Sequence, residues 1–387
     1  MAEQAKVPAI RFAGFTDPWE QRKLSEVATF GGGHTPPMAD PDNYEDGYVL
    51  WVTSQDVKSN YLDRTTTQIT EKGAKELTLY PAGSLVMVTR SGILRHTLPV
   101  AELRKPSTVN QDIRVILPQG ECCGEWLLQF FISHNKELLL EFGKTGTTVE
   151  SVDFGKIKDM LLYMPSTVEQ QQIGDFFAKL DSLITLHQRK YDKLVIFKKS
   201  MLEKMFPKDG ESVPEIRFAG FTDPWEQRKF SEIVDVCSGR DYKHLDEGPI
   251  PVYGTGGYMT SVSEALSHNR DAIGIGRKGT IDKPYLLKAP FWTVDTLFYA
   301  IPKSDINLEF ALCSFLNVDW KSKDESTGLP SLSKESINET VLSVPNVVEQ
   351  NHLGNFFADL DRLITLHQRK LELLQNIKKS LLDKMFV

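Results

Sequence analysis

Hydrophobic residues recur every three to four positions in two long stretches of the chain. From Ile173 to Met205 they form an a/d heptad seam, and a seam in the same register returns from Leu353 to Met385. This period, sustained for over four heptads, predicts long helices that pair with each other. We place them at about 168–206 and about 348–386. Further apolar residues widen the first stripe, as expected for a helix that also packs on a domain or a partner; they are Phe176, Leu183, Phe197 and Leu202.

Polar residues interrupt both seams at matching positions. The first seam carries His187 and Lys198, and the second carries His367 and Lys378. A buried polar residue at an a or d position lowers stability but fixes the alignment of two helices. Because neither histidine has a second metal ligand three or four residues away, we interpret the two histidines as solvated polar seam residues, with a metal site as the weaker alternative. A helix of about 33 residues is roughly 50 Å long, which matches about 14 or 15 base pairs of B-DNA.

The segments that precede these helices have a different pattern. Short β-rich runs alternate with Gly, Pro and Asn; they lie at 48–52, 84–88, 113–117, 272–275 and 296–301. Helical stretches follow at 125–142 and 308–318. Each segment is therefore predicted to form a compact α/β domain.

The chain is an internal duplication. The segment Ile10–Lys23, IRFAGFTDPWEQRK, returns unchanged as Ile216–Lys229, and a second shared block begins at Glu169 and again at Glu349. The segments between these blocks align only sparsely, with VMVTRSGILRHTLPV facing IGIGRKGTIDKPYLL and VNQDIRVILP facing TVDTLFYAIP. We interpret them as one fold with different surfaces, which suits paired recognition better than paired catalysis.

Composition narrows the class of protein. The chain has 387 residues, a formal net charge of -7 and the apolar content of a globular protein. The first ten residues contain no run that could serve as a signal peptide, and no stretch is long and apolar enough to span a membrane, so a cytoplasmic protein is expected. The four cysteines form no C-x-x-C pair, which suggests neither a zinc site nor a disulfide framework. The negative charge weakens a nucleic-acid interpretation without excluding a basic face.

Residues that suit DNA contacts occur in the turns of both middle segments. Arg, Asn, Gln and small hydroxyl residues hydrogen-bond base edges and phosphates. The turns at 89–92 and 276–279 each carry an arginine, as a tip inserted into a groove would require, although an ordinary solvated hairpin is an equal alternative. We expect only a minority of the candidates to touch bases. They are His34, Thr53, Ser54, Gln55, Arg90, Arg95, Asn110, Gln111, Arg240, Lys243, Tyr253, Thr255, Arg277 and Lys278.

Signals for catalysis are weak. Residues 274–279 fit G-x-G-x-x-G, but the sequence that follows, with Pro284, favours a turn into another strand rather than a phosphate-binding helix. The acidic group of Asp40, Asp42 and Asp46 lies in turn-rich sequence, where solvated surface is the better interpretation. The chain also lacks a P-loop and the N-P-P-Y or D-P-P-Y element of amino-methyltransferases. No catalytic and no metal-binding residue is therefore expected.

The chain resembles the DNA specificity subunit of type I restriction-modification systems. The resemblance covers nearly the whole chain. It lies in the repeated DPWEQRK lead-in, the GGGHTP turn, the passages TGTTVESVDFGKIKDMLLYMPSTVEQQQIG and TGLPSLSKESINETVLSVPNVVEQNHLG, and the terminal heptads. Single motifs are loose, but their order and duplication are specific.

The resemblance implies an α/β (α+β) fold with two globular target recognition domains on a long antiparallel two-helix coiled coil, related by an internal pseudo-twofold repeat. The first specificity domain would span 17–190, with target recognition at about 28–150. Residues 207–222 would form the linker and the start of the repeat, and the second domain would span 223–387, with target recognition at about 235–330.

The same resemblance implies the partners. The protein would read the two halves of a bipartite site in double-stranded DNA and dock two modification subunits and the restriction subunits. S-adenosylmethionine, ATP and Mg are then expected on those partners, and no cofactor is expected in this chain. Two other classes stay open: a methyltransferase or nuclease that acts alone, and a coiled-coil scaffold with no role on DNA.

Overall fold

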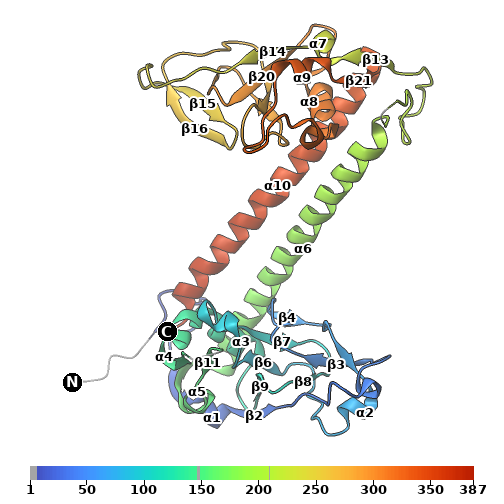
Figure 1. The fold of residues 1–387 in the computed structure, drawn as a ribbon. Helices are drawn as coiled ribbons and strands as arrows, with labels where there is room; N and C mark the ends of the chain where they lie inside the picture. Colours follow the sequence, from blue (N-terminus) through green and yellow to red (C-terminus); the bar gives the residue numbers. More distant parts are fainter. Residues whose placement is uncertain (1–6, 146–148, 209) are drawn as a thin grey trace. The chain divides into compact units, whose positions relative to one another are not determined.

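The computed structural model describes residues 7–145, 149–208 and 210–387 (Figure 1). Met1–Lys6, part of the segment tested for a signal peptide, and residues 146–148 of the TGTTVES passage lie outside this range. The chain forms two compact units. Unit 1 contains the residues up to Leu186 together with Lys370–Val387, and unit 2 contains His187–Arg369. This division assigns the last residues of the chain to the first unit, whereas the sequence-based boundaries placed them in the second domain.

Two helices of 39 residues, α6 (Thr167–Met205) and α10 (Val347–Met385), each contribute to both units. Their facing residues run in opposite directions: in unit 2, His187 meets His367, and the later Lys198 meets the earlier Asp361. The helices are therefore antiparallel, as the resemblance implied.

The seam lysines form ion pairs across the two helices. In unit 2 the Nζ of Lys198 lies 2.6 Å from Asp361, and in unit 1 the Nζ of Lys378 lies 2.6 Å from Asp181. Lys378 and Asp181 are each only 8% exposed. Lys198 and Lys378 occupy equivalent positions in the two repeats, and so do Asp181 and Asp361. Each seam lysine therefore binds an aspartate of the opposite helix.

Unit 1 is built on two sheets. The larger has the strand order β2 (Ala28–Gly32), β9 (Ile113–Pro118), β6 (Leu85–Val88), β7 (Val100–Leu103) and β4 (Tyr61–Leu62). The smaller has the order β5 (Gln68–Ile69), β3 (Val49–Val52) and β8 (Thr108–Val109). The helix α3 (Gly124–Ser133) packs on β7 and β9 and buries Trp126 and Phe131. Two further helices of this unit are α2 (Glu71–Ala74) and α4 (Asn135–Phe142).

Unit 2 repeats the central part of this topology. One sheet has the order β14 (Val234–Ser238), β20 (Leu297–Pro302), β17 (Ala272–Gly276) and β18 (Tyr285–Leu287). The other has the order β16 (Gly257–Val262), β15 (Ile250–Gly254) and β19 (Trp292–Thr293). The helix α8 (Leu308–Asn317) takes the place of α3. Strands β2, β9, β6 and β7 thus correspond to β14, β20, β17 and β18, which confirms the sparse alignment of the two middle segments.

The blocks shared by the two repeats form a framework beside each domain. In unit 1, β1 (Glu20–Lys23) pairs with β12 (Leu161–Met164), and in unit 2, β13 (Glu226–Lys229) pairs with β21 (Val341–Val344). Short helices adjoin these ribbons at α1 (Leu24–Val27), α5 (Phe154–Asp159), α7 (Phe230–Ile233) and α9 (Lys334–Glu339). A further ribbon in unit 1 joins β10 (Gly143–Lys144) to β11 (Ser151–Val152).

A buried ion pair joins the first shared block to the second in both copies. Nε and a terminal nitrogen of Arg11 donate to the two carboxylate oxygens of Glu169, at 2.8 and 2.6 Å. Arg217 binds Glu349 in the same way, at 2.7 and 2.8 Å. Each glutamate is only 1% exposed. The two-pronged pairing requires the planar guanidinium of arginine. A lysine has the same charge but could not replace the arginine at either position.

Among the residues that the structure describes, no helix combines the length and the apolar character that crossing a bilayer requires.

Candidate nucleic-acid interface

The candidate contact loops of unit 1 meet at one edge of its sheets. Strand β2 ends at Gly32, which pairs with Arg114 near the start of the antiparallel strand β9. Strand β6 ends at Val88, which also pairs with the start of β9. Because antiparallel neighbours begin where their partners end, the loops after β2 and β6 and the loop before β9 share this edge. The end of β3 joins them, since the amide of Asn110 donates to the carbonyl of Val52 at 3.0 Å.

Contacts between the loops hold this edge together. The hydroxyl of Thr35 donates to the side-chain oxygen of Gln111 at 2.6 Å, and the indole of Trp51 donates to the carbonyl of His34 at 3.3 Å. We call this edge the strand-end face of unit 1. Its candidate residues are His34, Thr53, Ser54, Gln55, Arg90, Asn110 and Gln111.

Unit 2 has a corresponding edge with different side chains. The amide of Arg240 donates to the carbonyl of Thr293 at 2.9 Å, and the amide of Val294 donates to the carbonyl of Tyr253 at 3.0 Å. The amide of Arg277 donates to the carbonyl of Thr296 at 2.8 Å. These bonds define the strand-end face of unit 2, whose candidates are Arg240, Tyr253, Thr255, Arg277 and Lys278. Lys243 is exposed in the loop that begins at Arg240.

One glycine in each unit permits the close approach of these strands. A side chain on Gly33 would collide with the backbone carbonyl of Val109, and one on Gly239 would collide with that of Val294. The obstacle is backbone in both cases, so it cannot rotate away. The two glycines belong to turns that otherwise differ, GGGHT and SGRDY, which shows that geometry is retained where surface chemistry changes.

The two turns that carry Arg90 and Arg277 are held by the passages that begin TGTTVES in the first repeat and TGLPSLS in the second. Arg90 forms a bridge with Ser151, and the amide of Ser91 donates to the carbonyl of Glu150 at 3.1 Å. In unit 2, Lys278 bridges to Ser331, and the amide of Gly279 donates to the carbonyl of Pro330 at 2.8 Å. Both arginines are exposed. The shared passages therefore hold each turn in place while its guanidinium stays accessible.

Several candidates already have internal partners. Asn110 is only 6% exposed, and its side-chain oxygen accepts from the amide of Asp112 at 3.1 Å. The hydroxyl of Thr53 donates to the carboxylate of Asp56 at 2.8 Å. These contacts shape the turns themselves, so we give both residues a structural role and leave them out of the proposed reading set.

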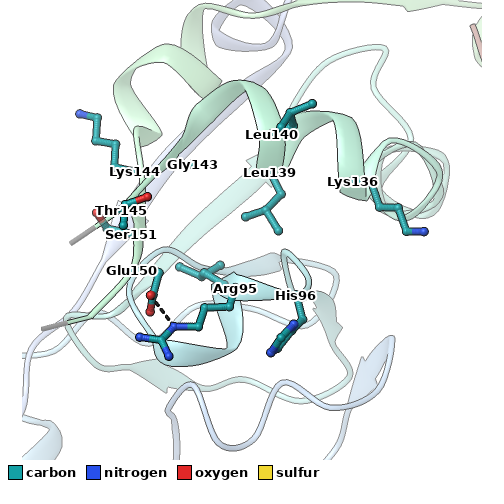
Figure 2. A pocket seen from close by; sticks show the side chains of 11 residues that line it. Arg95, His96, Lys136, Leu139, Leu140, Gly143, Lys144, Thr145, Glu150 and Ser151 are labelled. Carbon is teal, nitrogen blue, oxygen red and sulfur yellow. Dashed lines mark hydrogen bonds and ion pairs between the residues drawn. The ribbon is translucent and has the colours of Figure 1, made fainter. Parts of the chain in front are cut away.

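Arg95 lies beside α4. It binds Glu150, whose pKa is lowered by this neighbouring guanidinium. Together they line a cavity of about 610 Å³ with His96, Lys136 and Lys144 (Figure 2). The carbonyl of the same Glu150 accepts from the amide of Ser91, so Arg95 lies beside the turn that carries Arg90.

Sequence reasoning missed Arg114. This exposed residue lies on β9 between the buried Ile113 and Val115. A side chain at Gly32 would meet its guanidinium, so the glycine leaves room for it at the strand-end face. In unit 2 the aligned position is Phe298, over which the guanidinium of Arg277 lies at 5.8 Å. The signal was present in the sequence as a single basic residue within the apolar run IRVIL.

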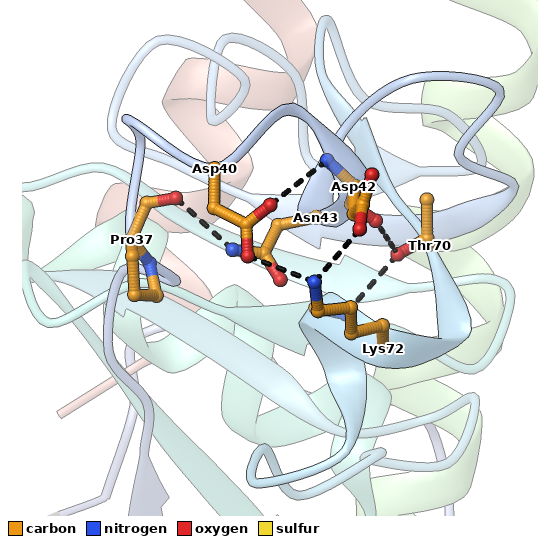
Figure 3. A network of polar contacts seen from close by, with 7 residues as sticks. Pro37, Asp40, Asp42, Asn43, Thr70 and Lys72 are labelled. Atoms are coloured by element: carbon orange, nitrogen blue, oxygen red, sulfur yellow. Dashed lines mark hydrogen bonds and ion pairs between the residues drawn. The ribbon is translucent and has the colours of Figure 1, made fainter.

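The acidic group near residue 40 is a structural clamp (Figure 3). The Nζ of Lys72 lies 2.9 Å from a carboxylate oxygen of Asp40 and 2.9 Å from one of Asp42. Lys72 lowers the pKa of Asp40, and the hydroxyl of Thr70 donates to the carbonyl of Asp42. Within the described ranges, no three His, Cys, Asp or Glu side chains are placed to hold a metal ion. The group thus connects two loops of unit 1.

The fold and these faces define a class: a duplicated protein that presents two different loop surfaces on one shared framework. A family model described as "Type I restriction modification DNA specificity domain" matches residues 16–195 and 222–376. Since these ranges cover most of the sequence, the chain belongs to this family.

Two curated relatives are specificity subunits of type I restriction enzymes. The chain is 29% identical over 186 residues to the EcoR124I/EcoR124II specificity subunit of Escherichia coli, an alignment that covers 45% of this chain and 46% of that protein. It is 28% identical over 234 residues to the MjaIX specificity subunit of Methanocaldococcus jannaschii, covering 57% and 52%. The chain thus spans about half the length of these relatives.

A solved structure supports the fold over the full length. The crystal structure of the type I restriction-modification system S subunit from M. genitalium matches with a TM-score of 0.68 and 16% identity, over 99% of both chains. This likeness concerns the fold.

Proposed function

We propose that this chain is the DNA-reading subunit of a type I restriction-modification complex, in which each unit reads one half of a bipartite target. The observation that carries the proposal is the pair of strand-end faces: both units bring the same strand ends together but place different side chains on them. Equal frameworks with unequal surfaces suit the recognition of two different short sequences.

The side chains at the faces have suitable chemistry for DNA. Exposed arginines form bidentate contacts to guanine and charge-assisted contacts to phosphate. Unit 1 offers Arg90 and Arg114 with the amide of Gln111, and unit 2 offers Arg240 and Arg277, all of them exposed. Because these cations lie on the two strand-end faces, the overall net charge of -7 does not argue against DNA binding there.

The outer faces of the long helices suit the docking of two identical partners. Leu183 and Leu186 on α6 are 47% and 46% exposed, and their repeats Leu363 and Leu366 on α10 are 40% and 45% exposed. Both pairs belong to the identical octapeptide LITLHQRK. An exposed apolar stripe on a helix marks an interaction surface, and two copies of one stripe favour two copies of one partner, which we assign to modification subunits.

The proposed partners carry the chemistry. In this scheme the modification subunits bind S-adenosylmethionine and methylate adenine, and the restriction subunits use ATP and Mg. This chain contributes sequence recognition in the cytoplasm and no catalytic residue. A solitary methyltransferase would instead methylate DNA as a purified chain, and a pure scaffold would bind no duplex in a salt-dependent way.

Methylome sequencing tests the proposal. Cells that carry this chain with its modification partner should methylate adenine in a bipartite motif with an unread spacer, and deletion of the chain should abolish this methylation. A contiguous palindromic motif, or methylation by the chain alone, would contradict the proposal.

Single substitutions in the same assay assign the faces. Arg277→Ala should relax the motif in one half only, and Arg114→Ala should relax the other half. Each lost bidentate contact removes about 1–3 kcal/mol of discrimination at one base pair. Arg64→Ala is the matched control in unit 1, because this exposed arginine pairs with its neighbour Asp63 and should leave the motif unchanged. A change in both halves would place the substituted residue in the framework.

A further inference from the structure

The two seam histidines meet where α6 and α10 face each other. Nδ1 of His187 and Nδ1 of His367 are 2.8 Å apart, and the ring centroids are 5.1 Å apart at an interplanar angle of 44°. Both side chains are half-buried. A metal site was the weaker alternative from sequence because each histidine lacks a second ligand on its own helix. The antiparallel pairing supplies that ligand from the opposite helix.

The separation of the two nitrogens is close to what one metal ion requires. Zinc binds imidazole nitrogen at about 2.0–2.1 Å, so two ligands of a tetrahedral ion are about 3.3 Å apart, and two adjacent ligands of an octahedral ion about 3.0 Å apart. The observed 2.8 Å contact is a hydrogen bond, and the centroid distance of 5.1 Å shows that the two nitrogens point directly at each other. A shared ion therefore requires an opening of a few tenths of an ångström and a turn of each ring by roughly 35–45°, so that both lone pairs converge on it. Rotation of the two half-buried side chains about their own torsions provides this turn.

The seam positions next to the two histidines carry uncharged side chains. The next seam positions are Ile184 and Tyr191 on α6, and Ile364 and Leu371 on α10. The adjacent cations of the repeated LITLHQRK segment, Arg189 and Lys190 with their repeats, are exposed.

We propose that His187 and His367 form a transition-metal site that clips α6 to α10, with Zn²⁺, Co²⁺ or Ni²⁺ as the class of ligand. Imidazole is a preferred ligand for these ions. The two histidines supply two ligands, and water occupies the remaining positions. Binding requires both imidazoles in the neutral form, so it weakens as the pH falls. The ion joins the helices directly and stabilises their pairing by mass action.

Titration of the purified full chain with Co²⁺ tests this site. After treatment with a chelator, the chain should bind one equivalent of Co²⁺ with the visible absorption bands of protein-bound cobalt, and Zn²⁺ should displace it. Zn²⁺ should also raise the Tm, and chelator should reverse the rise. Either His187→Gln or His367→Gln should weaken binding at least about 10-fold, since each removes one of two ligands.

A matched control lies on the same helix. His352 packs against Phe218 and Phe221 in unit 2, away from the seam pair. His352→Gln should bind Co²⁺ as the unsubstituted chain does, and circular dichroism should report equal helix content in all variants. The site is refuted if Co²⁺ does not bind at one equivalent, or if both seam variants bind as well as the control. Neither result bears on the methylation motif, so this test stands apart from that of the proposed function.

Discussion

The two seam ion pairs have the same residue types in both units but different surroundings. In unit 1, Asp181 and Lys378 are each 10% exposed in their side chains, and Asp181 also accepts from Nδ2 of Asn60 at 2.9 Å and from Nε2 of Gln129 at 3.4 Å. In unit 2 the side chain of Asp361 is 44% exposed. Asn60 and Gln129 belong to the first middle segment, whose side chains differ from those of the second middle segment. The non-repeated part therefore decides how much a repeated contact contributes to stability.

The framework arginines Arg11 and Arg217 are the reference for this comparison. Their substitution should have the largest effect on the free energy of unfolding. Arg11→Ala and Arg217→Ala each leave a buried glutamate without its partner, which costs about 3–5 kcal/mol. Because the two pairs have the same geometry and burial, we expect the two losses to agree within about 0.5 kcal/mol. Urea denaturation of the single variants measures this. A large inequality would show that the framework is not equivalent in the two units.

The seam aspartates should separate the units. Asp181→Ala leaves the buried Lys378 uncompensated and removes the acceptor of Asn60, for a loss of about 3 kcal/mol. Asp361→Ala acts on a partly exposed pair and should cost at most about 1 kcal/mol. The free energies of unfolding of the two variants provide the test, and equal losses would contradict the role given to the surroundings.

A double substitution distinguishes pairing from packing. Asp181→Leu with Lys378→Leu removes both charges together, so it should restore most of the stability that Asp181→Ala loses. If the double variant is no more stable than the single one, the loss comes from packing rather than from an uncompensated charge.

The smallest expected effect concerns Glu102, in the polar group that adjoins Asn60. Burial and the nearby carboxylate of Glu125 raise the pKa of Glu102 to about 7, while Arg104 at 3.0 Å opposes the shift. A carboxyl whose pKa is higher in the folded state binds protons more tightly there, so it makes the fold less stable as the pH rises from 4.5 to about 7.

Glu102→Gln removes this titration. The variant should be more stable than the unsubstituted chain by roughly 1 kcal/mol at pH 8 and gain nothing at pH 4.5. The gain in stability is smaller than the full pKa shift of Glu102 implies, because the ion pair to Arg104 is also lost. Denaturation curves at the two pH values decide this, and a gain that is equal at both would exclude titration as the cause.

Much of the fold could be predicted because its signals are local. The heptad seam determines the helices, and the exact repeats reveal the duplication. The partners of the seam lysines could not be read from the same pattern, because Asp181 and Asp361 lie outside the apolar seam and meet the lysines only once the register of the opposite helix is known. The burial of Asp181 depends further on Asn60, which is 121 residues away along the chain.

The candidate faces were predicted less completely, for a related reason. Turn chemistry identified the loops, since Arg90 and Arg277 follow strands that align between the repeats. It did not separate side chains that point outward from those that close the turn, such as Asn110. Arg114 was missed because it lies within a strand, where its exposure depends on Gly32 of the neighbouring strand rather than on its own sequence context.

The symmetry of the seam has one more consequence. Helix α6 carries both Asp181 and Lys198, so two copies of α6 from separate molecules could form the same two ion pairs and the same histidine contact that α6 forms with α10. The interface itself therefore encodes little preference for its partner within the chain. That preference comes from covalent connection, which makes the pairing of α6 with α10 intramolecular, so the tether and not the seam selects the pairing.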